Sequence, residues 1–353
     1  MTKTAVIFSP VYYRHNPGKS HPESARRLHA IVKELAKKEA AAQKNWNFVK
    51  PEMASVEDVE LVHGIEYIKL VEAVCRSGGG LLDLEDTVVS PESYKVALYA
   101  VGGALKAVKL VLKCDFQNAF ALVRPPGHHA SKYRACGFCL FNNVAIAAKY
   151  LIQKCDFKRV LILDVDAHHG NGTQEIFYET SKVLYISLHE DPYGFPGTGF
   201  AGEVGEGEGE GYNVNVPLPF MTADDVYLRA AKEIVEPIVA QYDPQFVLVS
   251  AGFDGHFSDP VGNLSLSESC YQKVFELIVN LTSKTACGRL VSILEGGYNA
   301  RFLGKNVAIA LAAIDGVSCN IHSKFRKSSR SVKKRGEKVI EEVRKIQKKY
   351  WAI

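Results

Sequence analysis

The sequence has no long apolar run. No window of about 18 residues is apolar throughout, which predicts that the chain has no membrane-spanning helix. At the N-terminus only four consecutive apolar residues, Ala5–Phe8, precede Ser9 and Pro10. A secretory signal peptide needs a longer apolar region and a small-residue cleavage site, so this run is better interpreted as a first β-strand. We therefore expect no membrane partner and a cytoplasmic protein, or a nuclear one if its source is eukaryotic.

The sequence also lacks a disulfide framework. Its eight cysteines in 353 residues have no dense, regular spacing, and a chain of this length can bury a large core without cross-links. Cys136 and Cys139 have the spacing of a redox or zinc pair, but no second pair accompanies them. We expect reduced cysteines that pack in the core.

Net charge is small, +4, and unevenly placed. Between Ser323 and Tyr350 lie 12 Lys and Arg and 3 Glu, a local charge of +9, which leaves −5 for the rest of the chain. With 47% hydrophobic and 23% charged residues, the composition is that of a globular protein and excludes a disordered chain. We predict one domain over residues 1–320 and a basic, largely helical extension over 321–353.

Apolar, β-branched runs alternate with helical patterns along the chain. Near-continuous apolar runs are typical of parallel strands that are buried on both faces. We expect such strands at 119–123, 160–165, 183–188, 246–250 and 290–294, and helices at 91–112, 143–154, 224–241 and 267–282. The alternation predicts an α/β fold with a doubly wound, mostly parallel sheet.

Polar residues that carry chemistry follow five of these strands. They lie in Arg124–His129, Asp164–Gly172, Ser187–His189, Ala251–Asp259 and Glu295–Tyr298. Open α/β sheets bind their ligands outside the carboxyl ends of the strands. We therefore expect an active site at this edge.

Asp164, Asp166 and His168 alternate along one strand, so their side chains leave the sheet on the same side. A carboxylate and an imidazole from this strand, with a further carboxylate from another loop, make a three-ligand site with an open position. Such a site suits catalytic Zn²⁺, and Fe²⁺ also fits these ligand types. Asp259, five residues beyond Asp254, is the candidate for the third ligand after Asp166 and His168.

Two adjacent histidines, His128 and His129, follow a rigid Pro-Pro-Gly turn and are candidates for proton transfer. Asp164 and Asn171 are available to orient their rings. Tyr298 follows two glycines, and its phenol could donate a hydrogen bond to a developing oxyanion.

At these motifs the sequence resembles the zinc-dependent histone deacetylase superfamily, from about residue 5 to residue 315. Asn171, Glu295–Asn299 and Tyr212–Pro217 are similar to its class II branch, which has bacterial and archaeal relatives that include acetylpolyamine amidohydrolases. The matching segments are Arg124–His129, Gly137–Asn143, Asp164–Gly172, Phe195–Gly199, Ala251–Asp254 and Glu295–Asn299.

The resemblance implies the arginase–deacetylase fold and Zn²⁺ held by Asp166, His168 and Asp259. A metal-activated water would attack the acetyl carbonyl, and Tyr298 would stabilise the oxyanion. The resemblance further implies that His128 and His129 are the base and the acid, supported by Asp164 and Asn171 respectively. Asn171 stands where another branch has Asp, so His129 has a neutral partner.

The same resemblance implies a narrow substrate tunnel and two potassium sites. Phe138 and Phe195, with Gly137, resemble the tunnel walls around an acyl-lysine chain. One implied K⁺ site uses Asp164, Asp166, His168, Ser187 and Leu188, and the other uses Phe177, Thr180, Val183 and Tyr212.

Several alternatives remain open from the sequence. The substrate is acetyl-lysine in a protein, or an acetylated polyamine or another small amide. The basic extension also fits a chromatin or nucleic-acid binding module, while a ureohydrolase of the same fold would need a two-manganese carboxylate cluster. The oligomeric state is not indicated.

The extension has an apolar stripe at Val339, Val343, Ile346 and Tyr350, with spacings of four, three and four. This predicts a helix that docks on the domain, with a cationic outer face that could contact nucleic acid. The preceding segment, 324–335, is basic and poorly patterned and is expected to be mobile. We expect deletion of 323–353 to leave turnover of a small substrate largely intact, provided that the helix is not needed for folding.

Overall fold

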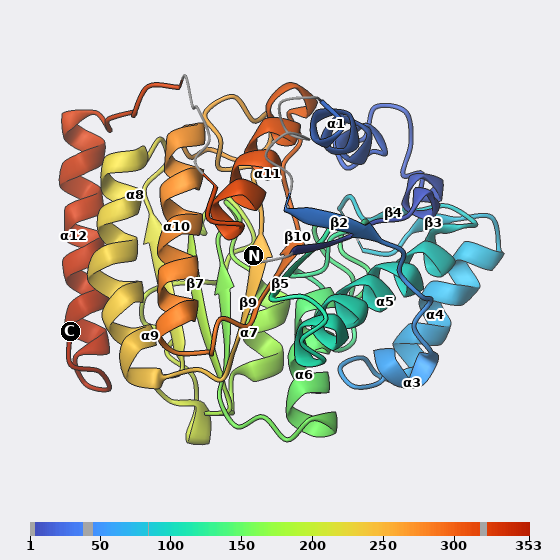
Figure 1. Ribbon diagram of the computed structural model, residues 1–353, viewed down its shortest axis with the longest axis horizontal. Coiled ribbons are helices and arrows are strands. Elements are labelled where there is room, and N and C mark those ends of the chain that lie inside the picture. The colour runs from blue at the N-terminus through green and yellow to red at the C-terminus, as the bar shows by residue number, and fades with distance from the viewer. Residues whose placement is uncertain (1–3, 38–44, 84, 318–322) are drawn as a thin grey trace.

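Eight strands, all paired in parallel, form the central sheet among residues 4–37, 45–83, 85–317 and 323–353, which the computed structural model describes (Figure 1). Every residue of the six inner strands is buried, which accounts for their near-continuous apolar sequences. The order across the sheet is β2 (Trp46–Val49), β1 (Thr4–Ile7), β5 (Asn118–Ala121), β10 (Leu290–Leu294), β9 (Phe246–Ala251), β6 (Val160–Asp164), β7 (Val183–Glu190) and β8 (Asn213–Leu218). A small antiparallel ribbon pairs β3 (Gly80–Leu81) with β4 (Val88–Val89).

Helices cover both faces of this sheet (Figure 1). The longer ones are α1 (Arg26–Leu35), α4 (Ile65–Arg76), α5 (Ser93–Leu112), α6 (Asn143–Lys154), α10 (Glu268–Lys284), α11 (Ala300–Ile314) and α12 (Arg330–Gln347). The shorter ones are η1 (Pro10–Arg14), α3 (Val56–Val59), α7 (Asn171–Phe177), η2 (Gly207–Gly209), α8 (Asp224–Ala230), η3 (Ala231–Val235) and α9 (Glu236–Tyr242). On one face α5 packs on β1, β5 and β10, and α6 packs on β6 and β9; on the other, α1, α11, α10 and α8 pack against one another in sequence. This is the doubly wound α/β architecture that the sequence predicts.

The helix expected over 224–241 is interrupted. It forms α8, then the π-helical turn η3, then α9. Pro237 lies in the first turn of α9 and has no N–H to donate to the carbonyl of Glu233, so the regular hydrogen-bond ladder cannot run through this point. Among the described residues, no helix is long and apolar enough to span a membrane.

The C-terminal extension is docked on the domain, with α12 against β8, α8 and η3 (Figure 1). Of the predicted apolar stripe, Val343 is fully buried, and the other members are half-buried. The side of α12 that packs on the domain is therefore displaced around the helix axis from the predicted stripe. At Gly336 the helix approaches Val226 so closely that a Cβ would collide with it. The buried face consists of Val332, Gly336, Ile340, Val343 and Gln347.

The segment before α12 is held in place, and the expectation that 324–335 is mobile is wrong. The Arg326 guanidinium lies 4.3 Å from the ring centroid of Phe257 and donates to Ser265 Oγ at 3.1 and 3.2 Å. The Ser328 N–H and hydroxyl both donate to Asp225 Oδ1, at 2.9 and 2.8 Å. From Arg330 onward the chain is helical. The predicted domain boundary at 320/321 lies outside the described residues.

Candidate active site

The carboxyl ends of β5, β10, β9 and β6 lie side by side at one edge of the sheet. Asp164, which ends β6, pairs in register with Ser250 of β9, and Ala251 of β9 pairs with Leu294 of β10. The segments that follow these strands contain the polar residues singled out in the sequence. Gly127 and Glu295, 168 residues apart in the chain, are thereby brought together by the strand order.

Two carboxylates and one imidazole form a buried group at this edge. His168 Nδ1 lies 3.0 Å from Asp254 Oδ2 and 3.4 Å from Asp166 Oδ1. One ligand atom from each of the three residues lies within 4.8 Å of the others, as a metal ion requires. Burial and the nearby Asp166 carboxylate raise the pKa of Asp254 to about 7, which is the repulsion that a bound cation would relieve. The donor set, one nitrogen and two carboxylates, fits Zn²⁺.

The third member of this group is Asp254, so the structure corrects the expectation that Asp259 completes the ligand set. Asp259 Oδ2 accepts hydrogen bonds from the backbone N–H groups of Tyr298 and Asn299, at 2.7 and 3.0 Å. Its Oδ1 accepts from Val261 N at 3.0 Å. The carboxylate of Asp259 therefore ties two loops together, and it is not a member of the group formed by Asp166, His168 and Asp254.

A sequence signal for Asp254 was present but missed. The preceding Gly252 is pressed against Asp166, and a Cβ at this position would collide with the Asp166 carboxylate. Gly296, after β10, is pressed against Asp166 and Asp254 in the same way. Glycines within two residues of the ends of the neighbouring strands β9 and β10 thus make room for the two carboxylates.

Each histidine of the pair has its own partner. His128 Nδ1 lies 3.0 Å from Asp164 Oδ2, and His129 Nδ1 lies 2.8 Å from Asn171 Oδ1. Burial opposes charge on His128, but the carboxylates of Asp164 and Asp166 outweigh it and raise its pKa to about 10. Burial and the neighbouring His128 hold the pKa of His129 well below its usual value. The two imidazoles therefore differ in protonation at neutral pH.

Glu295 supports this pair, a role that sequence reasoning did not assign. Its Oε2 accepts hydrogen bonds from the backbone N–H groups of Gly127 and His128, at 2.7 and 3.2 Å. The carboxyl is fully buried, and burial raises its pKa to about 7. Arg27, also fully buried, donates from Nη2 to the Glu295 carbonyl and from Nε to the Gly297 carbonyl at 2.7 Å.

Tyr298 lies beside this polar group, with the Arg27 guanidinium 4.9 Å from its ring centroid. Burial raises the pKa of its phenol well above the usual value, so the hydroxyl keeps its proton and remains a donor. Gly297, just before it, has φ of 116°, a conformation that favours glycine.

Two aromatic rings flank the group, as the resemblance implies for tunnel walls. The Phe138 ring lies 5.7 Å from that of Tyr298, and the Phe195 ring lies 5.0 Å from that of His129 (centroid distances). The backbone N–H of each of Cys136 and Cys139 donates a hydrogen bond to the carbonyl of the other, and Gly137 and Phe138 form the turn between them. The spacing of these cysteines therefore matches a tight turn, and the described cysteines are free thiols.

Residues of the two implied potassium sites form hydrogen bonds with other groups of the chain. In the first set the Ser187 hydroxyl pairs with His189 Nδ1 at 2.7 Å. In the second, the Tyr212 carbonyl accepts from Tyr185 N at 2.9 Å and the Phe177 carbonyl accepts from Thr180 N at 3.3 Å. Both sites stay predictions.

A doubly wound sheet whose carboxyl edge holds a buried aspartate–histidine–aspartate group, paired histidines and a protonated phenol defines a hydrolase that acts on amides. The sequence profile of the histone deacetylase domain matches residues 21–314. The chain belongs to the histone deacetylase family.

Individual relatives agree with this assignment. The "Probable deacetylase" of Archaeoglobus fulgidus is 39% identical, and the alignment covers 99% of this chain and 98% of that protein. The "Histone deacetylase-like amidohydrolase" of Pseudomonas aeruginosa is 35% identical over 86% of this chain and 79% of that one. The crystal structure of the HDA15 HD domain superposes with a TM-score of 0.89 at 34% identity, covering 99% of this chain and 95% of that one. The fold is therefore the arginase–deacetylase fold implied by the resemblance.

Proposed function

We propose that the protein removes acetyl groups from acetylated lysine side chains of proteins, with Zn²⁺ held by Asp166, His168 and Asp254. The observation that carries this proposal is the buried group of three ligand atoms, with the His129 ring centroid 6.3 Å from that of His168. When bound, Zn²⁺ supplies a Lewis acid that lowers the pKa of water and polarises the acetyl carbonyl. Fe²⁺ would fit the same ligands.

The histidine pair moves the protons. His129 is neutral in this environment, so it can accept the proton of the attacking water. His128 holds a proton beside Asp164 and can stabilise negative charge or supply a proton to the leaving amine. This assigns base and acid in the order opposite to that implied by the resemblance. The physical reason is that His128 pairs with a carboxyl group, that of Asp164, whereas His129 pairs with the amide of Asn171.

The remaining residues bind and orient the substrate. The Tyr298 hydroxyl donates to the carbonyl oxygen as its negative charge grows. Phe138 and Phe195 enclose the apolar part of a lysine side chain and exclude water from the scissile amide. We also propose that K⁺ binds at the two predicted sites, because oxygen ligands suit hard cations.

The test is an assay of the purified protein against an acetyl-lysine peptide and an acetylated polyamine, with metal analysis of the same sample. Faster turnover of the peptide (as kcat/KM), with about one Zn²⁺ per chain, supports the proposal. Faster turnover of the acetylated polyamine would show that the substrate is a polyamine, while the proposed deacetylation chemistry would still hold. Absence of turnover on both, in protein loaded with Zn²⁺ or Fe²⁺, would contradict the proposed function.

A further inference from the structure

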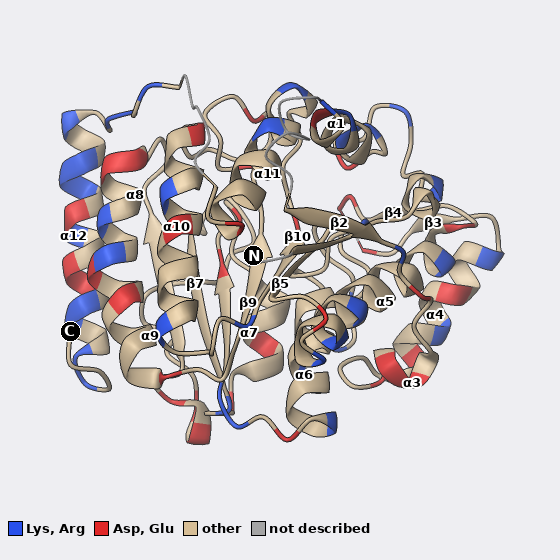
Figure 2. Cartoon of the chain, in the orientation of Figure 1, with Lys and Arg blue, Asp and Glu red and all other residues tan. Residues whose placement is uncertain are grey.

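The extension presents an exposed cationic face that the candidate active site does not use. We call this the basic face, and it contains ten exposed Lys and Arg side chains. Figure 2 shows the Lys and Arg positions of α12 along the outer edge of the molecule, beyond α8. The members of the basic face are Lys324, Lys327, Arg330, Lys333, Lys334, Arg335, Lys338, Lys345, Lys348 and Lys349.

The basic face is not neutralised by neighbouring carboxylates. Among the described residues, none of its ten side chains forms an ion pair. The nearby acids are engaged elsewhere: Glu233 with Arg344 at 3.4 Å, and Glu337 with Arg229 at 3.0 Å. Glu341 and Glu342 are the remaining exposed acids of α12.

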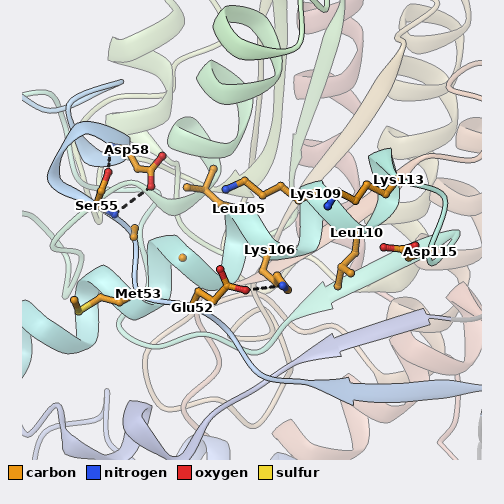
Figure 3. A pocket seen from close by; sticks show the side chains of 12 residues that line it. Glu52, Met53, Ser55, Asp58, Leu105, Lys106, Lys109, Leu110, Lys113 and Asp115 are labelled. Atoms are coloured by element: carbon orange, nitrogen blue, oxygen red, sulfur yellow. Dashed lines mark hydrogen bonds and ion pairs between the residues drawn. The ribbon is translucent and has the colours of Figure 1, made fainter.

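A second row of lysines on this protein is accompanied by carboxylates and serves as a comparison for the basic face. Lys106 and Lys109 of α5, with Lys113 just after it, line a groove of about 420 Å³ (Figure 3). The same groove contains the carboxylates of Glu52, Asp58 and Asp115, and Lys106 Nζ lies 2.7 Å from Glu52 Oε1. The groove therefore contains three lysines and three carboxylates. The basic face, by contrast, has ten cations and two acids that form no ion pair within the described part of the chain.

The charge in the first turns of α12 does not stabilise the helix itself. Its first turn has no acidic residue, and Arg330, Lys333 and Lys334 stand at the positive end of the helix dipole, which disfavours cations. Lys334 and Lys338, four residues apart, repel each other. The docking contacts of α12 are made by the opposite, apolar face. The cations at the start of α12 are thus unfavourable for the helix, whereas Lys345 and Lys348 lie at its C-terminal end, where the dipole favours cations.

The spacing of the cations suits a duplex. Lys334, Lys338, Lys345 and Lys348 are separated by four, seven and three residues, so they lie on one side of α12. Between Lys338 and Lys345 the helix rises about 10 Å, close to the width of about 12 Å of a DNA major groove. Cations on both sides of the Glu341–Glu342 pair can therefore contact phosphates on both strands.

We propose that the basic face binds duplex DNA through its phosphates, without reading the base sequence. Such binding releases counterions, so it weakens steeply as salt is added. No residue of the basic face belongs to the candidate active site. Nucleic-acid binding and deacetylation can therefore be tested, and can fail, separately.

The experiment is a fluorescence-anisotropy titration of a labelled duplex of about 20 base pairs and mixed sequence with the full-length protein, from about 50 to about 200 mM salt. The test variant is Lys334→Gln/Lys338→Gln/Lys345→Gln, because Gln and Lys have similar helix propensities. The control is Lys106→Gln/Lys109→Gln/Lys113→Gln, which removes the same charge from the balanced groove. Thermal unfolding checks that both variants are folded.

We expect the wild type and the control to bind alike, and the α12 variant to bind at least about tenfold more weakly at low salt. Its slope of log affinity against log salt should be shallower by about 3, since three phosphate contacts are lost. Equal weakening in both variants, or no salt-dependent binding by the wild type, would overturn the proposal. Tighter binding to phosphatidylserine vesicles than to the duplex would also overturn it.

Discussion

The carboxylate of Asp259 holds the backbone of Tyr298, with 2.7 Å between Asp259 Oδ2 and Tyr298 N. The loop after β9 thereby fixes the loop after β10, and Asp254 lies earlier in the same β9 loop. Two aspartates five residues apart thus have different tasks. Asp254 faces His168, and Asp259 positions the residue that donates to the substrate.

This division predicts different results for two single substitutions. Asp254→Ala removes one of three ligand atoms and should abolish both metal retention and turnover. Asp259→Ala should retain the metal but reduce kcat by about 10²-fold, since a displacement of about 1 Å at the reacting centre has that effect. Metal content by mass spectrometry, together with kcat, distinguishes them. Loss of metal from the Asp259 variant with retention by the Asp254 variant would restore the original assignment.

Replacing Tyr298 by Phe should leave the fold and the metal unchanged and reduce kcat by about 10²–10³-fold. The phenol contributes mainly as negative charge develops on the carbonyl oxygen, so KM should change much less than kcat. Steady-state kinetics on an acetyl-lysine peptide check this. If the Phe variant has wild-type kcat, Tyr298 is not the oxyanion donor.

The sequence was sufficient for the sheet and for most of the site because both follow local rules. Buried parallel strands give continuous apolar runs, and chemistry-bearing residues lie at or soon after their carboxyl ends, as Asp164 does at the end of β6 and His128 does in the segment after β5. The choice between Asp254 and Asp259 depends on how one loop turns, which residue spacing does not encode. The role of Glu295 depends on backbone groups 167 and 168 residues away, so only the folded chain reveals it.

Glu295 predicts a pH dependence of stability. Its pKa is raised from 4.5 to about 7 in the folded state by burial, so the folded state binds a proton that the unfolded state releases. Stability is therefore highest below about pH 4.5 with respect to this group, falls by about 3 kcal/mol as pH rises to about 7, and then stays constant. Glu295→Gln cannot ionise and should make the unfolding free energy less dependent on pH in this window. Urea unfolding from pH 5 to pH 8 measures it, and equal slopes for both proteins would contradict the assignment.

The docked extension changes what we expect from removing it. Deletion of 323–353 is expected to spare turnover only if the helix is not needed for folding, but Arg326 lies on Phe257 and Ile340 is fully buried. Ile340→Ala should reduce the unfolding free energy by about 2–5 kcal/mol, as a cavity in a packed core does. Deletion of the whole segment exposes the faces of β8 and α8 and should leave little soluble, folded protein, since the total stability of a domain is about 5–15 kcal/mol.

Urea unfolding of the point variant is the decisive measurement, with exposed Lys338→Ala on the same helix as the control, expected within about 0.5 kcal/mol of wild type. If Ile340→Ala unfolds at the wild-type urea concentration, α12 does not contribute to the core, and the deletion should then be tolerated after all.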